Sequence, residues 1–128
     1  MARVAAELLP CFEGGGQVHL RGDLGAGKTT LVRSLLREMG FAGRVKSPSY
    51  GLIESYALPG RQVHHLDLYR LSHGEELAFL GIEELFDGDA LILIEWPEKA
   101  QGFLPQPDWI VQLSDAPSGG RAIRLWKP

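Results

Sequence analysis

The segment from Gly22 to Thr29 constrains the fold of this chain more than any other. It has the pattern G-x-x-x-x-G-K-T, and its last position is Thr29. The run Gln17–Arg21 before it predicts a strand, and the spaced apolar residues of 31–39 after it predict an amphipathic helix. A strand, a glycine-rich loop and a helix in this order form a phosphate-binding loop, in which backbone N–H groups surround an anion. The alternative is a glycine turn in an ordinary strand–helix unit, which the complete pattern and both flanks disfavour.

Two side chains in the pattern have defined roles toward a nucleoside triphosphate. Lys28 is expected to contact the β- and γ-phosphates, and the hydroxyl of Thr29 is expected to ligate Mg²⁺. Guanine-specific proteins with this loop use an Asn-Lys-x-Asp element, and the chain contains no asparagine. The sequence therefore favours ATP over GTP.

Length and composition are those of an ordinary globular protein. The 128 residues suit one domain, with 45% hydrophobic and 23% charged residues. The longest uninterrupted apolar stretch, Ala90–Ile94, is too short to span a membrane, and no signal-peptide pattern is present. We therefore expect a cytoplasmic protein. Because Cys11 is the only cysteine, an internal disulfide and a cysteine-based zinc site are excluded.

The charge distribution disfavours a freestanding nucleic-acid binder. The net charge is −3, whereas such binders neutralise phosphates with an excess of basic residues. Residues 1–70 carry nine Lys and Arg against six Asp and Glu, and residues 71–128 carry four against ten. The acidic second part is interpreted as a solvated helix face in preference to a docking surface for a basic partner.

The remaining pattern predicts an α/β domain with a mixed sheet flanked by helices. A helix is expected within 3–13, and the helix after the phosphate loop is expected to run from Lys28 to Met39 and stop at Gly40. After the strand that ends at Leu68, the pattern predicts a short helix through Leu80 and a further turn over Ile82–Phe86. The expected strands are Gln17–Arg21, Leu52–Tyr56, Gln62–Leu68, Ala90–Ile94, Trp109–Leu113 and Arg121–Trp126.

Two carboxylates stand at the ends of predicted strands. Asp67 ends the run Val63–Asp67, and Glu95 follows the apolar run Ala90–Ile94. Either carboxylate can hold Mg²⁺, directly or through water, while the other orients an attacking water. The competing interpretation of Asp67 is a surface charge. For Glu95 that interpretation is weaker, because a carboxylate directly after five apolar residues is costly unless it is paired or ligating.

Other side chains near these acids leave alternatives open. His65 shares a strand face with Asp67, and a packed or hydrogen-bonded histidine is favoured over a transition-metal ligand. In the loop 44–50, Ser49 offers a hydroxyl where phosphate-loop proteins keep a segment that senses the γ-phosphate, and a plain surface loop is the alternative. Arg70 either stabilises charge on the phosphoryl group or forms an ion pair with an acid.

Four motifs together resemble the TsaE family, also called YjeE. They are the phosphate loop extended to Thr30, S-P-S-Y at 47–50, H-L-D-L-Y-R-L at 65–71 and I-E-W-P-E at 94–98. They occur in the family's order and spacing, and the resemblance runs from about Gly14 to Trp126. The last two motifs are far more specific than the phosphate loop.

The resemblance implies a P-loop ATPase of tRNA threonylcarbamoyladenosine synthesis. Such an ATPase associates with TsaB and TsaD proteins, depends on ATP and Mg²⁺, and reaches tRNA only through the complex. Carried over by motif, Lys28, Asp67 and Glu95 are catalytic, and Thr29 and Glu95 hold the metal. The implied nucleotide-binding residues are Asp23, Leu24, Gly25, Ala26, Gly27, Lys28, Thr29, Thr30 and Arg121.

Two departures from the family pattern are visible. Position 49 is serine where the family more often has threonine, which retains the hydroxyl. Family members usually have a longer segment before the phosphate loop, with a threonine at the adenine, and no threonine precedes Thr29 here.

A small-molecule P-loop kinase and a nucleotide-gated binding module are the alternative functions. The chain lacks the arginine-rich insertion that a kinase lid would need.

Overall fold

The computed structural model describes residues 1–23, 25–46, 52–79 and 81–128. The α-helices are α1 (Ala2–Leu8), α2 (Lys28–Glu38) and α3 (Glu76–Phe79), and the short 3-10 helices are η1 (Leu9–Phe12), η2 (Ile82–Asp87) and η3 (Pro97–Ala100). The strands are β1 (Gly16–Arg21), β2 (Ile53–Leu58), β3 (Arg61–Asp67), β4 (Leu91–Glu95), β5 (Trp109–Asp115) and β6 (Arg121–Trp126).

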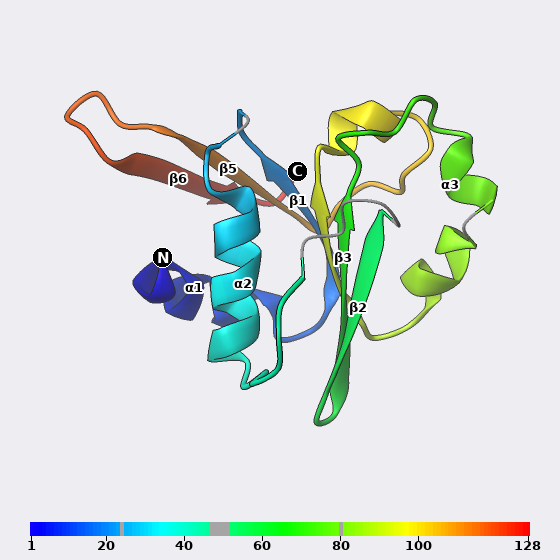
Figure 1. Ribbon diagram of the computed structural model, residues 1–128, viewed down its shortest axis with the longest axis horizontal. Coiled ribbons are helices and arrows are strands. Elements are labelled where there is room, and N and C mark those ends of the chain that lie inside the picture. The colour runs from blue at the N-terminus through cyan, green and yellow to red at the C-terminus, as the bar shows by residue number, and fades with distance from the viewer. Residues whose placement is uncertain (24, 47–51, 80) are drawn as a thin grey trace.

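All six strands form one mixed sheet in the order β2-β3-β4-β1-β5-β6. The four inner strands are parallel to their neighbours, and β2 and β6 each add an antiparallel partner at one edge. Figure 1 shows α1 and α2 on one side of this sheet and α3 on the other. The mixed sheet flanked by helices is therefore as predicted.

Each face of the sheet has its own apolar core. On one face, α2 packs Leu31 and Leu35 against Leu20 and Leu93 of the inner strands. The second core is formed by residues of β3, β4, α3, η2, η3 and the segment after β3. They are Leu66, Leu68, Leu71, Leu77, Ile82, Ile92, Ile94 and Ala100. The apolar residues of β4 alternate between the two cores and are all buried, as the uninterrupted apolar run predicted.

The ends of several elements differ from the predicted ones. The helix after the phosphate loop begins at Lys28 as expected and ends one residue early, and Gly40 follows it with a φ of 96°. The first hairpin is tighter than predicted, since Leu58 pairs with Arg61 and belongs to β2 instead of the turn. The helix α3 ends at Phe79, and the predicted end at Leu80 lies outside the described residues.

The register of the parallel strands determines where functional side chains meet. Asp67 of β3 is the partner of Glu95 of β4, which is in turn the partner of Leu20 of β1. These positions lie at the carboxyl ends of adjacent parallel strands, which is the edge where ligands bind in open α/β sheets. Within the part of the chain that the structure describes, no helix has the length and apolar character needed to cross a membrane.

Candidate nucleotide-binding site

The loop between β1 and α2 passes close to the neighbouring strand β5. Gly22 has a φ of 150°, and a Cβ placed on it would lie 2.7 Å from the carbonyl oxygen of Leu113 in β5. Gly27 caps α2 in the left-handed conformation, with a φ of 103°. Both positions suit glycine because other residues rarely adopt these angles. The chain can thus turn from the loop directly into α2 and leave the unpaired N–H groups of its first turn beside the loop.

Lys28, the first residue of α2, is buried at the centre of this loop, with 4% of its surface exposed. Its Nζ donates to the carbonyl oxygen of Gly22 and, over 3.4 Å, to that of Asp23. The same atom lies 3.7 Å from the ring centroid of Trp96, within cation–π distance. Burial lowers the pKa of Lys28, and nearby carboxylates, Glu95 first among them, oppose this shift. The ammonium group is therefore held by loop carbonyls and an aromatic face in a position next to the acids.

Glu95 is the buried carboxylate of the site, with 2% of its surface exposed. Its Oε2 accepts hydrogen bonds from Thr29 Oγ1 over 2.9 Å and from His65 Nε2 over 2.6 Å. Burial raises the pKa of Asp67, and the charge of Glu95 adds to this effect, whereas the hydrogen bond from the Tyr69 backbone N–H opposes it. Two acids thus converge beside the first turn of α2.

The oxygen donors at this point fit a magnesium ion. The Thr29 hydroxyl and the carboxylates of Asp67 and Glu95 are hard ligands, and a cation beside them would offset the repulsion between the two acids. Among the described residues, no group of three or more His, Cys, Asp or Glu side chains is arranged to hold a metal. A cation here would need further oxygens from phosphate and water, which is the usual coordination of Mg²⁺ at nucleotide sites.

Two aromatic residues form one wall of the site. Trp96 follows β4 directly and has a φ of 58° and a ψ of 49°, a left-handed conformation that costs a non-glycine residue about 1–2 kcal/mol. Its ring centroid lies 5.0 Å from that of Tyr69, which is 44% exposed. The strained turn after Glu95 therefore places an indole ring in contact with both Lys28 and the exposed ring of Tyr69.

A cavity of about 270 Å³ connects these groups. Arg121, from the start of β6, closes it on the side of the loop, where its Nη1 donates to the carbonyl oxygen of Gly25 over 3.1 Å. The residues around the cavity are Gly25, Gly27, Lys28, Thr29, Thr30, Asp67, Tyr69, Glu95, Trp96 and Arg121. They come from the loop, the first turn of α2, the ends of β3 and β4, and β6.

Most of the site residues predicted from the sequence meet at this cavity. Asp23 contributes a carbonyl oxygen to Lys28, and Ala26 is buried in the apolar core beneath the loop. Leu24 and Ser49 lie outside the described residues. The interpretation of His65 as a hydrogen-bonded histidine is confirmed by its contact with Glu95.

Two contacts were missed by the sequence analysis. The stacking of Lys28 on Trp96 has no sequence signal, because it depends on the left-handed turn at Trp96. The hydrogen bond between His65 and Glu95, in contrast, did have a sequence signal. Pairing the two acid-bearing strands in parallel, with Asp67 opposite Glu95, would have placed His65 on the face that carries both acids.

Comparison with known proteins identifies the family. A family model described as "Threonylcarbamoyl adenosine biosynthesis protein TsaE" matches residues 1–123. The chain belongs to the TsaE family. The resemblance seen in the four sequence motifs is therefore confirmed.

Individual relatives agree with this assignment. A Haemophilus influenzae protein named "tRNA threonylcarbamoyladenosine biosynthesis protein TsaE" is 53% identical over 96 residues, which are 75% of this chain and 61% of that protein. A Bacillus subtilis protein of the same name is 35% identical over 105 residues, 81% of this chain and 65% of that protein. The chain thus spans about three fifths of the length of the curated TsaE relatives it matches.

A solved structure supports the TsaE fold as well. The crystal structure of Bacillus subtilis YdiB matches with a TM-score of 0.75 and 29% identity, and the match covers 95% of this chain and 75% of that one. The similarity therefore extends over nearly all of the sheet and its helices.

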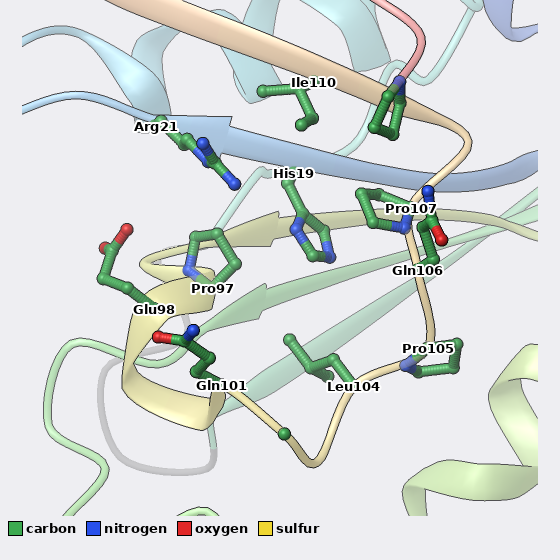
Figure 2. A pocket seen from close by; sticks show the side chains of 12 residues that line it. His19, Arg21, Pro97, Glu98, Gln101, Leu104, Pro105, Gln106, Pro107 and Ile110 are labelled. Atoms are coloured by element: carbon green, nitrogen blue, oxygen red, sulfur yellow. The ribbon is translucent and has the colours of Figure 1, made fainter.

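A second, larger hollow of about 490 Å³ lies on the opposite face of the sheet. Val18 and Leu20 belong to the core under α2, so His19 between them points to the other face. Figure 2 shows His19 and Arg21 on one side of this hollow and Pro97 and Glu98 of η3 beside them. The phosphate loop does not border it, so its larger size does not make it the nucleotide site.

We expect Gly22→Ala to destabilise the fold, because a Cβ at this position would meet the Leu113 carbonyl at 2.7 Å and the φ of 150° is unfavourable for alanine. The expected loss in the free energy of unfolding is at least about 2 kcal/mol. Gly14→Ala is the matched control, since a Cβ there meets nothing within 4 Å, and it should change stability by less than about 0.5 kcal/mol. Urea denaturation of both variants measures the difference, and equal effects would contradict the close approach.

Acid should destabilise the protein through His19. This histidine is 6% exposed, and burial, with Arg21 nearby, lowers its pKa from 6.5 to about 4. Between these values the unfolded chain binds a proton that the folded chain does not, so stability falls as the pH drops from 6.5 to 4. From pH 7.5 to pH 5 the expected contribution of His19 to this loss is about 2 kcal/mol. Urea denaturation at the two pH values measures it, and His19→Gln should reduce the loss; an unchanged loss in the variant would contradict this origin.

Proposed function

We propose that residues 1–128 act as one Mg²⁺-dependent ATPase domain in threonylcarbamoyladenosine modification of tRNA. The observation that carries the proposal is the convergence of Lys28 and Thr29 with the carboxylates of Asp67 and Glu95 at one cavity. These are the groups that a P-loop ATPase needs for phosphate, metal and water. The family and the names of its members supply the pathway.

The residues of the cavity divide the work of ATP hydrolysis between them. Lys28 and the N–H groups from Gly25 to Thr30 bind the phosphates, so that Lys28 exchanges the Gly22 carbonyl for phosphate oxygens. Thr29 and Glu95, which already contact each other over 2.9 Å, hold Mg²⁺. The bound ion offsets the negative charge of the phosphates and of the transition state. Asp67 orients the attacking water or supports the metal.

Arg121 is proposed to border the nucleotide on the side of the loop. Its hydrogen bond to the Gly25 carbonyl fixes a guanidinium group at the cavity without using all five of its N–H donors. The donors that make no hydrogen bond within the described residues suit phosphate or ribose oxygens. Arg121 is not proposed to contact the adenine base.

Proteins of the TsaB and TsaD types are the proposed partners, and tRNA is reached through their complex. The net charge of −3 supports an indirect role toward tRNA, because phosphate contacts by this chain alone would be opposed by its own charge. A cytoplasmic location follows from this role. We expect slow ATP hydrolysis by the isolated chain and faster turnover with the partners.

Lys28→Ala and Glu95→Gln test the assignment of roles. Lys28→Ala should weaken ATP binding, and Glu95→Gln should retain it in the absence of Mg²⁺. Each should reduce hydrolysis about 100-fold or more, because Lys28→Ala removes a positive charge from the phosphates and Glu95→Gln removes the negative charge that holds the cation. Lys127→Ala, at the exposed end of the chain, is the control. The measurements are binding of a fluorescent ATP analogue, phosphate release, and modified adenosine in tRNA with TsaB and TsaD proteins present.

Other outcomes would favour the alternative functions. Phosphorylation of a nucleoside or nucleotide acceptor from a panel would favour a small-molecule kinase. Full tRNA modification by Glu95→Gln without hydrolysis would favour a nucleotide-gated binding module. Complete modification by this chain without partners would contradict the proposed dependence on them.

A further inference from the structure

His65 is a fully buried histidine at the base of the nucleotide cavity, and the proposed function gives it no role. Its exposed fraction is 0%, and its Nε2 lies 2.6 Å from Glu95 Oε2. A carboxylate oxygen only accepts, so Nε2 carries the hydrogen and donates it to Glu95. Burying an imidazole is costly, and this short, charge-assisted bond is the kind of contact that offsets the cost.

The sheet holds the histidine in place from both sides. His65 is paired with Glu54 of the antiparallel strand β2 and with Leu93 of the parallel strand β4. Two residues farther along each inner strand, Asp67 and Glu95 are paired with each other. Because residues two apart share a face, His65 lies on the same face of the sheet as both acids.

The ring makes one polar contact within the described part of the chain. Its Nδ1 is buried and has no hydrogen-bond partner there, so its orientation is fixed by Glu95 Oε2 and by packing. Oε2 also accepts from Thr29 Oγ1, and Thr29 is the second residue of α2. Two donors from different elements, one on β3 and one on α2, therefore fix the rotation of this carboxylate.

We propose that His65 is a positioning residue that presets the Glu95 carboxylate for the cation. The proposal rests on the proposed function, in which Thr29 and Glu95 hold Mg²⁺. Thr29 must offer its oxygen to the ion, and the histidine bond keeps Glu95 oriented while it does so. Hydrogen bonds from outside the metal shell commonly change metal affinity by about 10- to 100-fold when they are removed. His65 should accordingly affect Mg²⁺ affinity and leave the Mg²⁺-free binding of nucleotide unchanged.

The adjacent histidine offers a matched control. His64 is also buried, with 7% exposure, and its Nδ1 lies 2.7 Å from Ser55 Oγ. It points to the opposite face of the sheet from His65, away from Glu95. Each substitution removes a buried, hydrogen-bonded imidazole from the same strand. Only the substitution of His65 removes a contact with Glu95.

The experiment compares His65→Leu, His65→Gln, His65→Asn and His64→Leu in the full chain. A glutamine amide extends to the position of Nε2, whereas an asparagine amide extends only to that of Nδ1. Binding of a fluorescent ATP analogue is titrated with MgCl₂ and is also measured in EDTA, with circular dichroism and melting temperature as checks of folding. We expect His65→Leu and His65→Asn to raise the Mg²⁺ concentration for half-maximal effect about 10- to 100-fold. His65→Gln should recover most of the affinity, and His64→Leu should keep it.

Several results would overturn the positioning role. One is a normal Mg²⁺ requirement in folded His65→Leu or His65→Asn, and another is an equal increase in His64→Leu. Equal loss in the Gln and Asn variants would also overturn it, and this pair decides the question if the Leu variant fails to fold. Nucleotide binding by the unaltered chain without any response to Mg²⁺ would instead contradict the proposed function on which the inference rests.

Discussion

A buried carboxylate needs hydrogen-bond donors or a cation, and this requirement at Glu95 organises the site. The residue ends a strand that is buried on both faces, so little of its surface is in contact with bulk water. Thr29 and His65 supply the donors from two other elements. The register of β3 against β4 and the position of the first turn of α2 are thereby tied to one carboxylate group. Movement of any of these elements would leave a charge unsatisfied.

The lysine of the loop has an analogous requirement. Lys28 is almost as buried as Glu95, and its ammonium group is satisfied by carbonyl oxygens of its own loop and by the face of Trp96. These are weaker partners than phosphate oxygens, because neither carries a full negative charge. Ligand binding can therefore replace them favourably without building a new cavity. The strain at Trp96 is local and maintains the indole in the position where it contacts the lysine.

The sequence predicted the parts of the site that follow from local pattern. The phosphate loop, the start of α2 at Lys28 and the buried strand before Glu95 depend on spacing within short segments, and the structure agrees with them. For Asp67 and Glu95, the sequence could predict only that each carboxylate stands at the end of a strand and that these strand ends lie near each other. The hydrogen bond from His65 to Glu95, 30 positions away, does not follow from local pattern, because it depends on the register between β3 and β4. The hairpin ends at Leu58 and Arg61 were also missed, because pairing between strands overrode the apparent turn.

Position in the sheet, more than the size of a hollow, identifies the candidate site of this protein. The larger hollow near His19 has a neutral histidine at its base, because burial keeps the pKa of that residue low. The smaller cavity contains a lysine, two acids and a helix N-terminus at the carboxyl ends of parallel strands. The segment after Glu95 borders both, with Trp96 at the nucleotide cavity and Pro97 and Glu98 at the other. A change in the Lys28–Trp96 contact would therefore affect a segment that lines the cavities on both faces of the sheet.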